Sequence, residues 1–63
     1  MKHYRIYCFD GGSRIISADW IEADSDDAAY HAAKEAFYCF RVEVWDRKRL
    51  IGRHMRSERG SWI

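Results

Sequence analysis

Two cysteines and three histidines are the side chains of this chain with the widest chemistry. Cys8 and Cys39 form no Cys-x-x-Cys pair, and His3, His31 and His54 have no metal-ligand spacing to each other or to the cysteines. A cysteine nucleophile needs a base beside it in a cleft, which a chain of 63 residues seldom builds. The sequence therefore predicts no catalytic residue, no metal site and no cofactor. An enzyme with Cys39 as nucleophile is the remote alternative.

The cysteine count and the apolar runs indicate a cellular compartment. Two cysteines in a chain of this length are not a disulfide framework. No apolar signal segment follows Met1, and no apolar run approaches the roughly 20 residues needed to span a bilayer. Cytoplasmic proteins keep their thiols reduced. We therefore expect a cytoplasmic protein without membrane contact, in which both thiols are free.

Five carboxylates lie close together before the centre of the chain: Asp19, Glu22, Asp24, Asp26 and Asp27. They lack the spacing and the glycine of a calcium-binding loop. Asp and Ser at a helix start accept hydrogen bonds from the free backbone N–H groups of the first turn. A structural role at a helix start is therefore the prediction for this cluster.

Alternation and turn residues divide the chain into four strands and one helix. The expected strands cover 4–9, 14–23, 41–45 and 49–53, with turns at 10–13 and 46–48. Strand 14–23 has no cleanly apolar face, which predicts a bulge near residues 17–19. A helix should run from 24–27 to about residue 38. Its apolar stripe would consist of Ala29, Ala32, Ala33, Ala36 and Phe37.

The order ββαββ predicts an α+β fold. A right-handed crossover through the helix places the third strand beside the first. The expected sheet is four-stranded and antiparallel, in the order 2-1-3-4, with the helix on one face. The side chains expected to face the helix are Tyr4, Ile6, Cys8, Val42, Val44 and Leu50. We expect a single domain over residues 1–54 and a basic C-terminal tail over residues 55–63.

The second face of the predicted sheet has no helix to cover it. Alternation places aromatic and aliphatic side chains there, together with arginines. A contiguous exposed apolar patch commonly marks an interface, and cyclic dimers are the commonest oligomers. The predicted interface residues are Arg5, Tyr7, Phe9, Trp20, Trp45 and Ile51. The primary expectation is a non-catalytic homodimer that acts by binding, with another protein as its partner.

Charge is divided unevenly along the chain. Residues 1–46 contain five Lys or Arg against nine Asp or Glu, whereas residues 47–63 contain six against one. Basic clusters bind phosphate backbones by releasing counterions. The alternative hypothesis is therefore a nucleic-acid-binding regulator that uses Arg47, Lys48, Arg49, Arg53, Arg56 and Arg59. A solvated or self-paired tail is the plainer interpretation of the same residues.

Residues 4–16, 21–29 and 42–46 together resemble a group of short uncharacterised bacterial proteins. The shared features are a first hairpin, an Ala-Asp-Ser-Asp helix entry and a final hairpin rich in Val and Trp. This resemblance implies the ββαββ fold over residues 4–53. Those proteins have no assigned activity, so the resemblance carries over no site residue. The first hairpin and the helix are also similar to HicB-type antitoxins, although the Pro-Gly-Cys segment of those proteins is missing here. That likeness implies an antitoxin-like regulatory function, which belongs to the alternative hypothesis.

Overall fold

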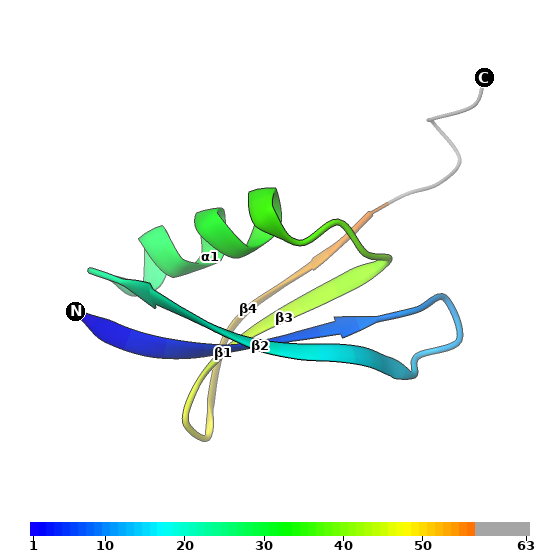
Figure 1. Ribbon diagram of the computed structural model, residues 1–63, viewed down its shortest axis with the longest axis horizontal. Coiled ribbons are helices and arrows are strands. Elements are labelled where there is room, and N and C mark those ends of the chain that lie inside the picture. The colour runs from blue at the N-terminus through cyan, green and yellow to red at the C-terminus, as the bar shows by residue number, and fades with distance from the viewer. Residues whose placement is uncertain (57–63) are drawn as a thin grey trace.

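The computed structural model describes residues 1–56 and confirms the predicted ββαββ order. Its elements are β1 (Lys2–Phe9), β2 (Ile15–Ala23), α1 (Asp26–Ala36), β3 (Arg41–Asp46) and β4 (Arg49–Met55). The strands form one antiparallel sheet in the order β2-β1-β3-β4, as predicted. Helix α1 lies over one face of this sheet, and no described residue forms a helix on the other (Figure 1).

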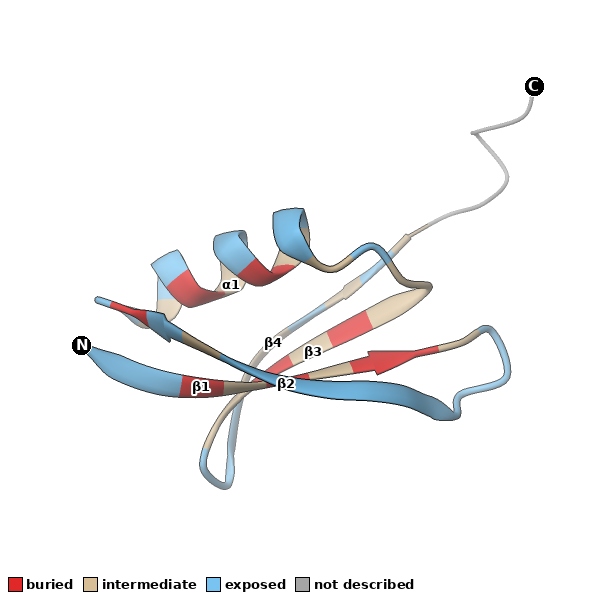
Figure 2. Ribbon diagram, viewed as in Figure 1, coloured by how far each residue is buried: buried red, intermediate tan, exposed pale blue. Residues whose placement is uncertain are grey.

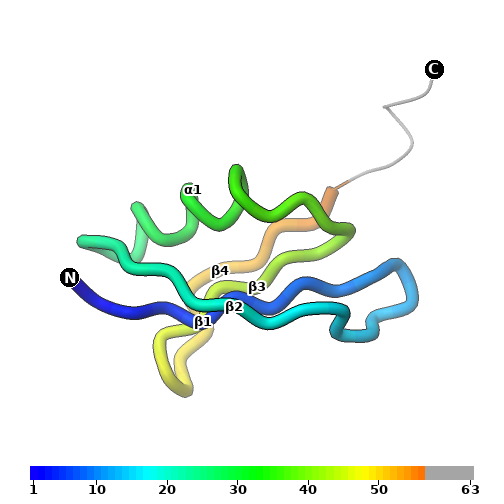
Figure 3. Tube along the Cα trace, viewed as in Figure 1, coloured from blue at the N-terminus to red at the C-terminus, as the bar shows by residue number. Residues whose placement is uncertain are grey.

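An aspartate closes the turn between β1 and β2. Asp10 Oδ1 accepts hydrogen bonds from the backbone N–H groups of Gly12 and Arg14, each at 2.9 Å. The Asp10 N–H donates to the Arg14 carbonyl at 2.9 Å, and Ser13 takes a left-handed φ of 68°. The side chain of Asp10 thus replaces the backbone acceptors that a tight turn leaves out. The chain reverses here, and β2 returns beside β1 (Figure 3).

Helix α1 begins and ends where its backbone hydrogen bonds are capped. Ser25 Oγ accepts from the Ala28 N–H at 3.1 Å, and two aspartates occupy the positive end of the helix dipole. The Phe37 N–H donates to the Ala33 carbonyl at 3.0 Å. Phe37 itself has extended φ and ψ, so the helix ends at Ala36, two residues before the predicted end.

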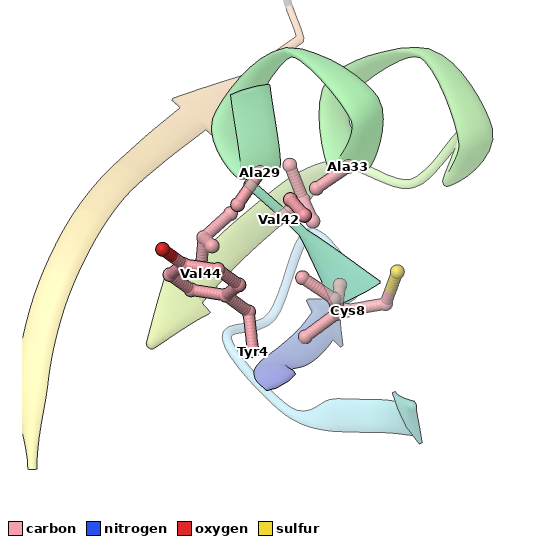
Figure 4. Packing of buried hydrophobic residues seen from close by; sticks show 8 residues of the cluster. Tyr4, Cys8, Ala29, Ala33, Val42 and Val44 are labelled. Atoms are coloured by element: carbon pink, nitrogen blue, oxygen red, sulfur yellow. The ribbon is translucent and has the colours of Figure 1, made fainter. Parts of the chain in front are cut away.

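The core lies between α1 and the central strands. It consists of Tyr4, Ile6, Cys8, Ala23, Ala29, Ala33, Val42 and Val44, all below 7% exposed. Figure 2 shows the buried segments on β1, β3 and the inner side of α1. In Figure 4, Ala29 and Ala33 point at Val42 and Val44, with the Tyr4 ring beside them. Small alanine side chains let the helix backbone approach the sheet closely.

The apolar stripe of the helix is narrower than predicted. Ala32 and Ala36 are exposed, whereas Tyr30 packs against the core from the other side of the stripe. The Tyr30 ring rests on Gly52 of β4, where an added Cβ would lie 2.8 Å from Cδ1 of the ring. The glycine therefore provides the space that the tyrosine ring fills.

A β-bulge interrupts each hairpin. In the first hairpin, Cys8 lies opposite Ser17 and Phe9 opposite Ile15, so Ile16 is the extra residue. This bulge adjoins the range 17–19 in which one was predicted. In the second hairpin, Val44 lies opposite Gly52 and Trp45 opposite Leu50, which leaves Ile51 as the extra residue.

The second bulge exchanges the predicted faces of two residues. Leu50 lies opposite Trp45 on the face away from α1, where it is 40% exposed. Ile51 packs against the core on the helix side. The predicted placement of both residues was wrong, because a bulge adds one residue to a period of two and reverses the faces beyond it.

A disulfide joins the two cysteines, which contradicts the prediction of two free thiols. Cys8 on β1 and Cys39 in the α1–β3 connection have Cα atoms 5.9 Å apart. This separation is the commonest one for bridged cysteines. No local pattern indicates the bond, because the partners are 31 positions apart and meet only through the fold.

The described chain continues past the predicted domain boundary at residue 54. Strand β4 includes Met55, and the Arg56 N–H donates to the Phe40 carbonyl at 2.8 Å. The rest of the predicted tail, residues 57–63, lies outside the described residues. Within residues 1–56, no helix has the length and the apolar character to cross a membrane.

Candidate interaction surface

The sheet face opposite α1, which we call the open face, is a grid of cross-strand neighbours. Paired residues of antiparallel strands place their side chains on the same face. Each row of the grid crosses the sheet in the order β2, β1, β3, β4. The rows are Trp20, Arg5, Trp45 and Leu50; Ala18, Tyr7, Glu43 and Arg53; and Ile15, Phe9, Arg41 and Met55.

Arginines stack on the aromatic rings of this face. The Arg5 guanidinium carbon lies 4.6 Å from the centroid of the Trp20 ring and 5.6 Å from that of Tyr7. The Arg41 guanidinium carbon lies 4.0 Å from the Phe9 centroid. Phe9 is consequently only 9% exposed, although no described helix covers this face. Stacking of this kind is favourable both as a cation–π contact and as burial of apolar surface.

Glu43 is the carboxylate at the centre of the grid. Its Oε1 accepts a hydrogen bond from Trp45 Nε1 at 3.1 Å. Its Oε2 lies 3.5 Å from Arg41 Nε and 3.9 Å from Arg53 Nη1. Its side chain is largely buried, so these contacts hold the neighbouring arginines and the Trp45 indole in fixed orientations.

Large apolar side chains are exposed along both edges of the open face. Trp20 is 60% exposed and Ile15 56% on β2, and Met55 is 55% exposed on β4. With Leu50, these residues flank a centre that the arginines cover. Trp45, Tyr7 and the arginines lie in the middle of the surface, and Trp20 and the aliphatic residues lie at its edges. This composition is typical of the energetically dominant parts of protein interfaces.

Most of the interface residues predicted from sequence lie together on this face. Arg5, Tyr7, Phe9, Trp20 and Trp45 occupy adjoining grid positions. Ile51 does not, because it packs on the helix side. Two central members were not predicted as site residues, Arg41 and Glu43. The strict alternation of residues 41–45 already places both on the face that carries Trp45, and it is the signal that could have identified them.

Of the six basic residues of the alternative hypothesis, the five within residues 1–56 do not form one surface. Arg49 Nη2 lies 3.1 Å from both Asp26 Oδ2 and Asp46 Oδ2. Arg53 pairs with Glu43 on the open face, and Arg56 donates to the Lys34 carbonyl at 2.5 Å and stacks on the Tyr38 ring. Arg47 and Lys48 are exposed in the β3–β4 turn, and Arg59 lies outside the described residues. Three of these six side chains are thus engaged within the fold.

A charged cluster on the helix side ties α1 to the sheet. Asp26 Oδ1 accepts a hydrogen bond from the buried Tyr4 hydroxyl at 2.8 Å, and Lys2 Nζ donates to Asp46 Oδ2 at 2.6 Å. The hydrogen bond from Tyr4, supported by Arg49, holds the pKa of Asp26 below its ordinary value. The hydrogen bond with Lys2 lowers the pKa of Asp46 and raises that of Lys2. Both carboxylates are therefore stabilised in their charged forms by the folded structure.

The histidines have no shared site. His3 Nε2 lies 2.9 Å from Glu22 Oε2, and His31 Nε2 lies 3.6 Å from Asp27 Oδ1. His54 lies opposite Val42 on β4, where burial, followed by the charges of Arg56 and Lys34, lowers its pKa. No cluster of three or more His, Cys, Asp or Glu side chains suited to a metal ion occurs in residues 1–56.

Comparison with known protein families, curated proteins and solved structures found no match to this chain. The resemblance to short uncharacterised bacterial proteins and to HicB-type antitoxins therefore stays a prediction. The arrangement of the open face itself is the basis for a proposed function.

Proposed function

We propose that this protein is a small non-catalytic interaction module that forms a homodimer through its open face. The observation that carries the proposal is the grid itself, in which Arg5 and Arg41 stack on aromatic rings around a central Glu43. Tyr, Trp and Arg are the residue types that supply most of the binding energy in interfaces. A second copy would cover the exposed Trp20, Ile15 and Met55 at the edges.

The size of the chain favours the same proposal. A domain of about 60 residues buries only about 60% of the surface that its unfolded chain exposes, and small domains often gain stability by association. The grid spans four strands about 4.8 Å apart and three rows about 7 Å apart, which gives a contact area of roughly 400 Å². Stable interfaces bury about 800 Å² on each partner. The dimer should therefore be weak, and it should form at micromolar concentrations or above.

Sedimentation equilibrium over a wide concentration range tests this function. Wild-type protein should show a reversible monomer–dimer equilibrium, and Trp45→Glu should shift it towards the monomer. The glutamate introduced at position 45 would be buried in the interface beside a second carboxylate, Glu43. The matched control is Tyr38→Glu, because Tyr38 is an exposed aromatic residue outside the grid. A wild-type protein that stays monomeric at the highest concentration would refute the dimer.

A second candidate function is nucleic-acid binding. The specific observation in its favour is the charge of the open face, where Arg5, Arg41 and Arg53 accompany two carboxylates, Glu43 and, at the His3 end, Glu22. Arginines beside sheet aromatics are suited to phosphates and stacked bases. Contacts to phosphates predict an affinity that falls steeply with salt, whereas apolar self-association predicts little dependence on salt. A salt series with single-stranded RNA therefore separates the two candidates.

A further inference from the structure

A cavity of about 710 Å³ lies at the end of the open face nearest the N-terminus and the β3–β4 turn. Its lining includes Arg5, Tyr7 and Trp20 of the grid, together with Lys2, His3, Arg47 and one carboxylate, Asp46. Pockets for small ligands usually enclose about 300–1,000 Å³ and combine aromatic walls with a few polar groups. This cavity has both properties.

Arg5 is a cation of this cavity whose charge no carboxylate of residues 1–56 compensates. Its Nε is buried and has no hydrogen-bond partner in residues 1–56. The ion pairs of the open face connect Glu43 to Arg41 and Arg53 and do not include Arg5. The rings of Trp20 and Tyr7 hold the guanidinium in place before any ligand arrives.

The other charged groups of the cavity are largely neutralised. Lys2 Nζ lies 2.6 Å from Asp46 Oδ2, and His3 Nε2 lies 2.9 Å from Glu22 Oε2. Arg47 is exposed in the adjoining turn. The uncompensated charge of the site is therefore positive and belongs to two guanidinium groups. Guanidinium groups bind phosphate and carboxylate oxygens in a bidentate geometry.

Trp20 gives the site a second recognition element. Its indole remains 60% exposed although Arg5 stacks on it. An exposed indole next to a cation is the arrangement on which proteins stack nucleobases beside their phosphates. A ligand that carries both an aromatic ring and an oxyanion would use both elements together.

We propose that this cavity binds one nucleotide, with its phosphate on Arg5 and its base on Trp20. Arg47 adds positive charge beside the phosphate position. The nucleotide could be a free mononucleotide or one unit of a single strand, because both present the same chemistry. The inference goes beyond self-association. The site shares Arg5 and Trp20 with the proposed dimer interface, so nucleotide binding should weaken the dimer by linkage.

Calorimetric titration of the full chain with adenosine 5′-monophosphate tests the proposal. The titration is done on wild-type protein and on Met55→Glu, a substitution at the edge of the grid that is two rows from Arg5 and outside the cavity lining. Binding to Met55→Glu at least as tight as to wild type is expected, so failure of the dimer proposal would not obscure the result. Arg5→Lys should weaken binding about tenfold or more, since lysine lacks the planar fork. Trp20→Ala should weaken it about tenfold.

Three further ligands and one control variant sharpen the outcome. Adenosine, which lacks the phosphate, should bind about tenfold more weakly than the monophosphate. Inorganic phosphate should bind more weakly as well, and equal affinity would overturn the assignment of a base site.

Arg53→Lys, an arginine of the grid outside the cavity, should leave the affinity unchanged. A short oligoadenylate that binds more tightly than the monophosphate would identify a strand as the source, and equal affinity would identify the free nucleotide. If neither the monophosphate nor the oligoadenylate binds at millimolar concentration, the proposal is overturned.

Discussion

Reduction of the disulfide between Cys8 and Cys39 should remove a large part of the stability of this protein. The bridge closes a loop with a sequence separation of 31. The chain-entropy relation gives a loss of about 12 cal/mol/K from the unfolded ensemble for such a loop, which corresponds to about 3.7 kcal/mol at 25 °C. A domain of this length has a total free energy of unfolding of roughly 3–9 kcal/mol. Reduction should therefore leave at most about 5 kcal/mol of that free energy, and at the lower end of the range it should unfold the protein.

Urea unfolding, followed by tryptophan fluorescence with and without a phosphine reductant, measures this effect. The oxidised protein should unfold at a clearly higher urea concentration than the reduced protein. Cys39→Ser is the control, because it should match the reduced wild type and should not respond to the reductant. Equal midpoints for oxidised and reduced wild type would refute the reasoning. So would two reactive thiols in the folded protein under oxidising conditions.

Three other changes test the packing and the electrostatics of the helix side. Gly52→Ala should lower the free energy of unfolding by about 1–3 kcal/mol, because the added Cβ would lie 2.8 Å from the tyrosine ring of α1. Gly11→Ala is the control in the same urea assay, because a Cβ added there has no neighbour within 4 Å. Asp26 has a lowered pKa, so it stabilises the fold above the ordinary carboxyl pKa and loses this effect as the pH falls. Asp26→Asn should therefore flatten the loss of melting temperature below about pH 4, and an unchanged acid limb would contradict this role. Burial lowers the pKa of His54, so the free energy of unfolding should decrease as the pH falls below the ordinary histidine pKa of 6.5. His54→Asn should remove this decrease in melting curves recorded at decreasing pH, and an unchanged decrease would contradict it.

The sequence predicted the fold because its strongest signals are local. Alternation over residues 41–45, the acidic start of α1 and the turn at residues 10–13 each specify one element, and handedness then fixes the strand order. The face assignments of β1 and β3 were correct because alternation in both strands is uninterrupted. The assignments failed at Leu50 and Ile51, where a bulge at residue 51 breaks the alternation. Nothing in the local sequence marks that bulge, since it results from pairing with β3.

Other features depend on contacts between distant parts of the chain. The disulfide requires the α1–β3 connection to return to β1, and only the folded topology brings Cys39 there. The stacking of Arg5 on Trp20 requires the register of the first hairpin. Composition could indicate that aromatic residues and arginines share a face. It could not show that the arginines lie on the rings, or that Arg5 would be left without a carboxylate.

The uneven charge along the chain has a different meaning once the strands are paired. The arginines of β4 are close to the acidic residues of the preceding segment, with Arg49 beside Asp26 and Arg53 beside Glu43. Much of the linear imbalance is therefore complementarity within the fold, which neutralises these charges before any partner arrives. The cavity cations that the described fold leaves without a carboxylate partner are Arg5 on the first strand and Arg47 in the β3–β4 turn. Removal of one charge should consequently weaken salt-dependent binding more in Arg5→Gln than in Arg49→Gln, because two carboxylate partners already neutralise Arg49. Equal responses would show that the charge of the whole surface, and not the cavity at its end, attracts the ligand.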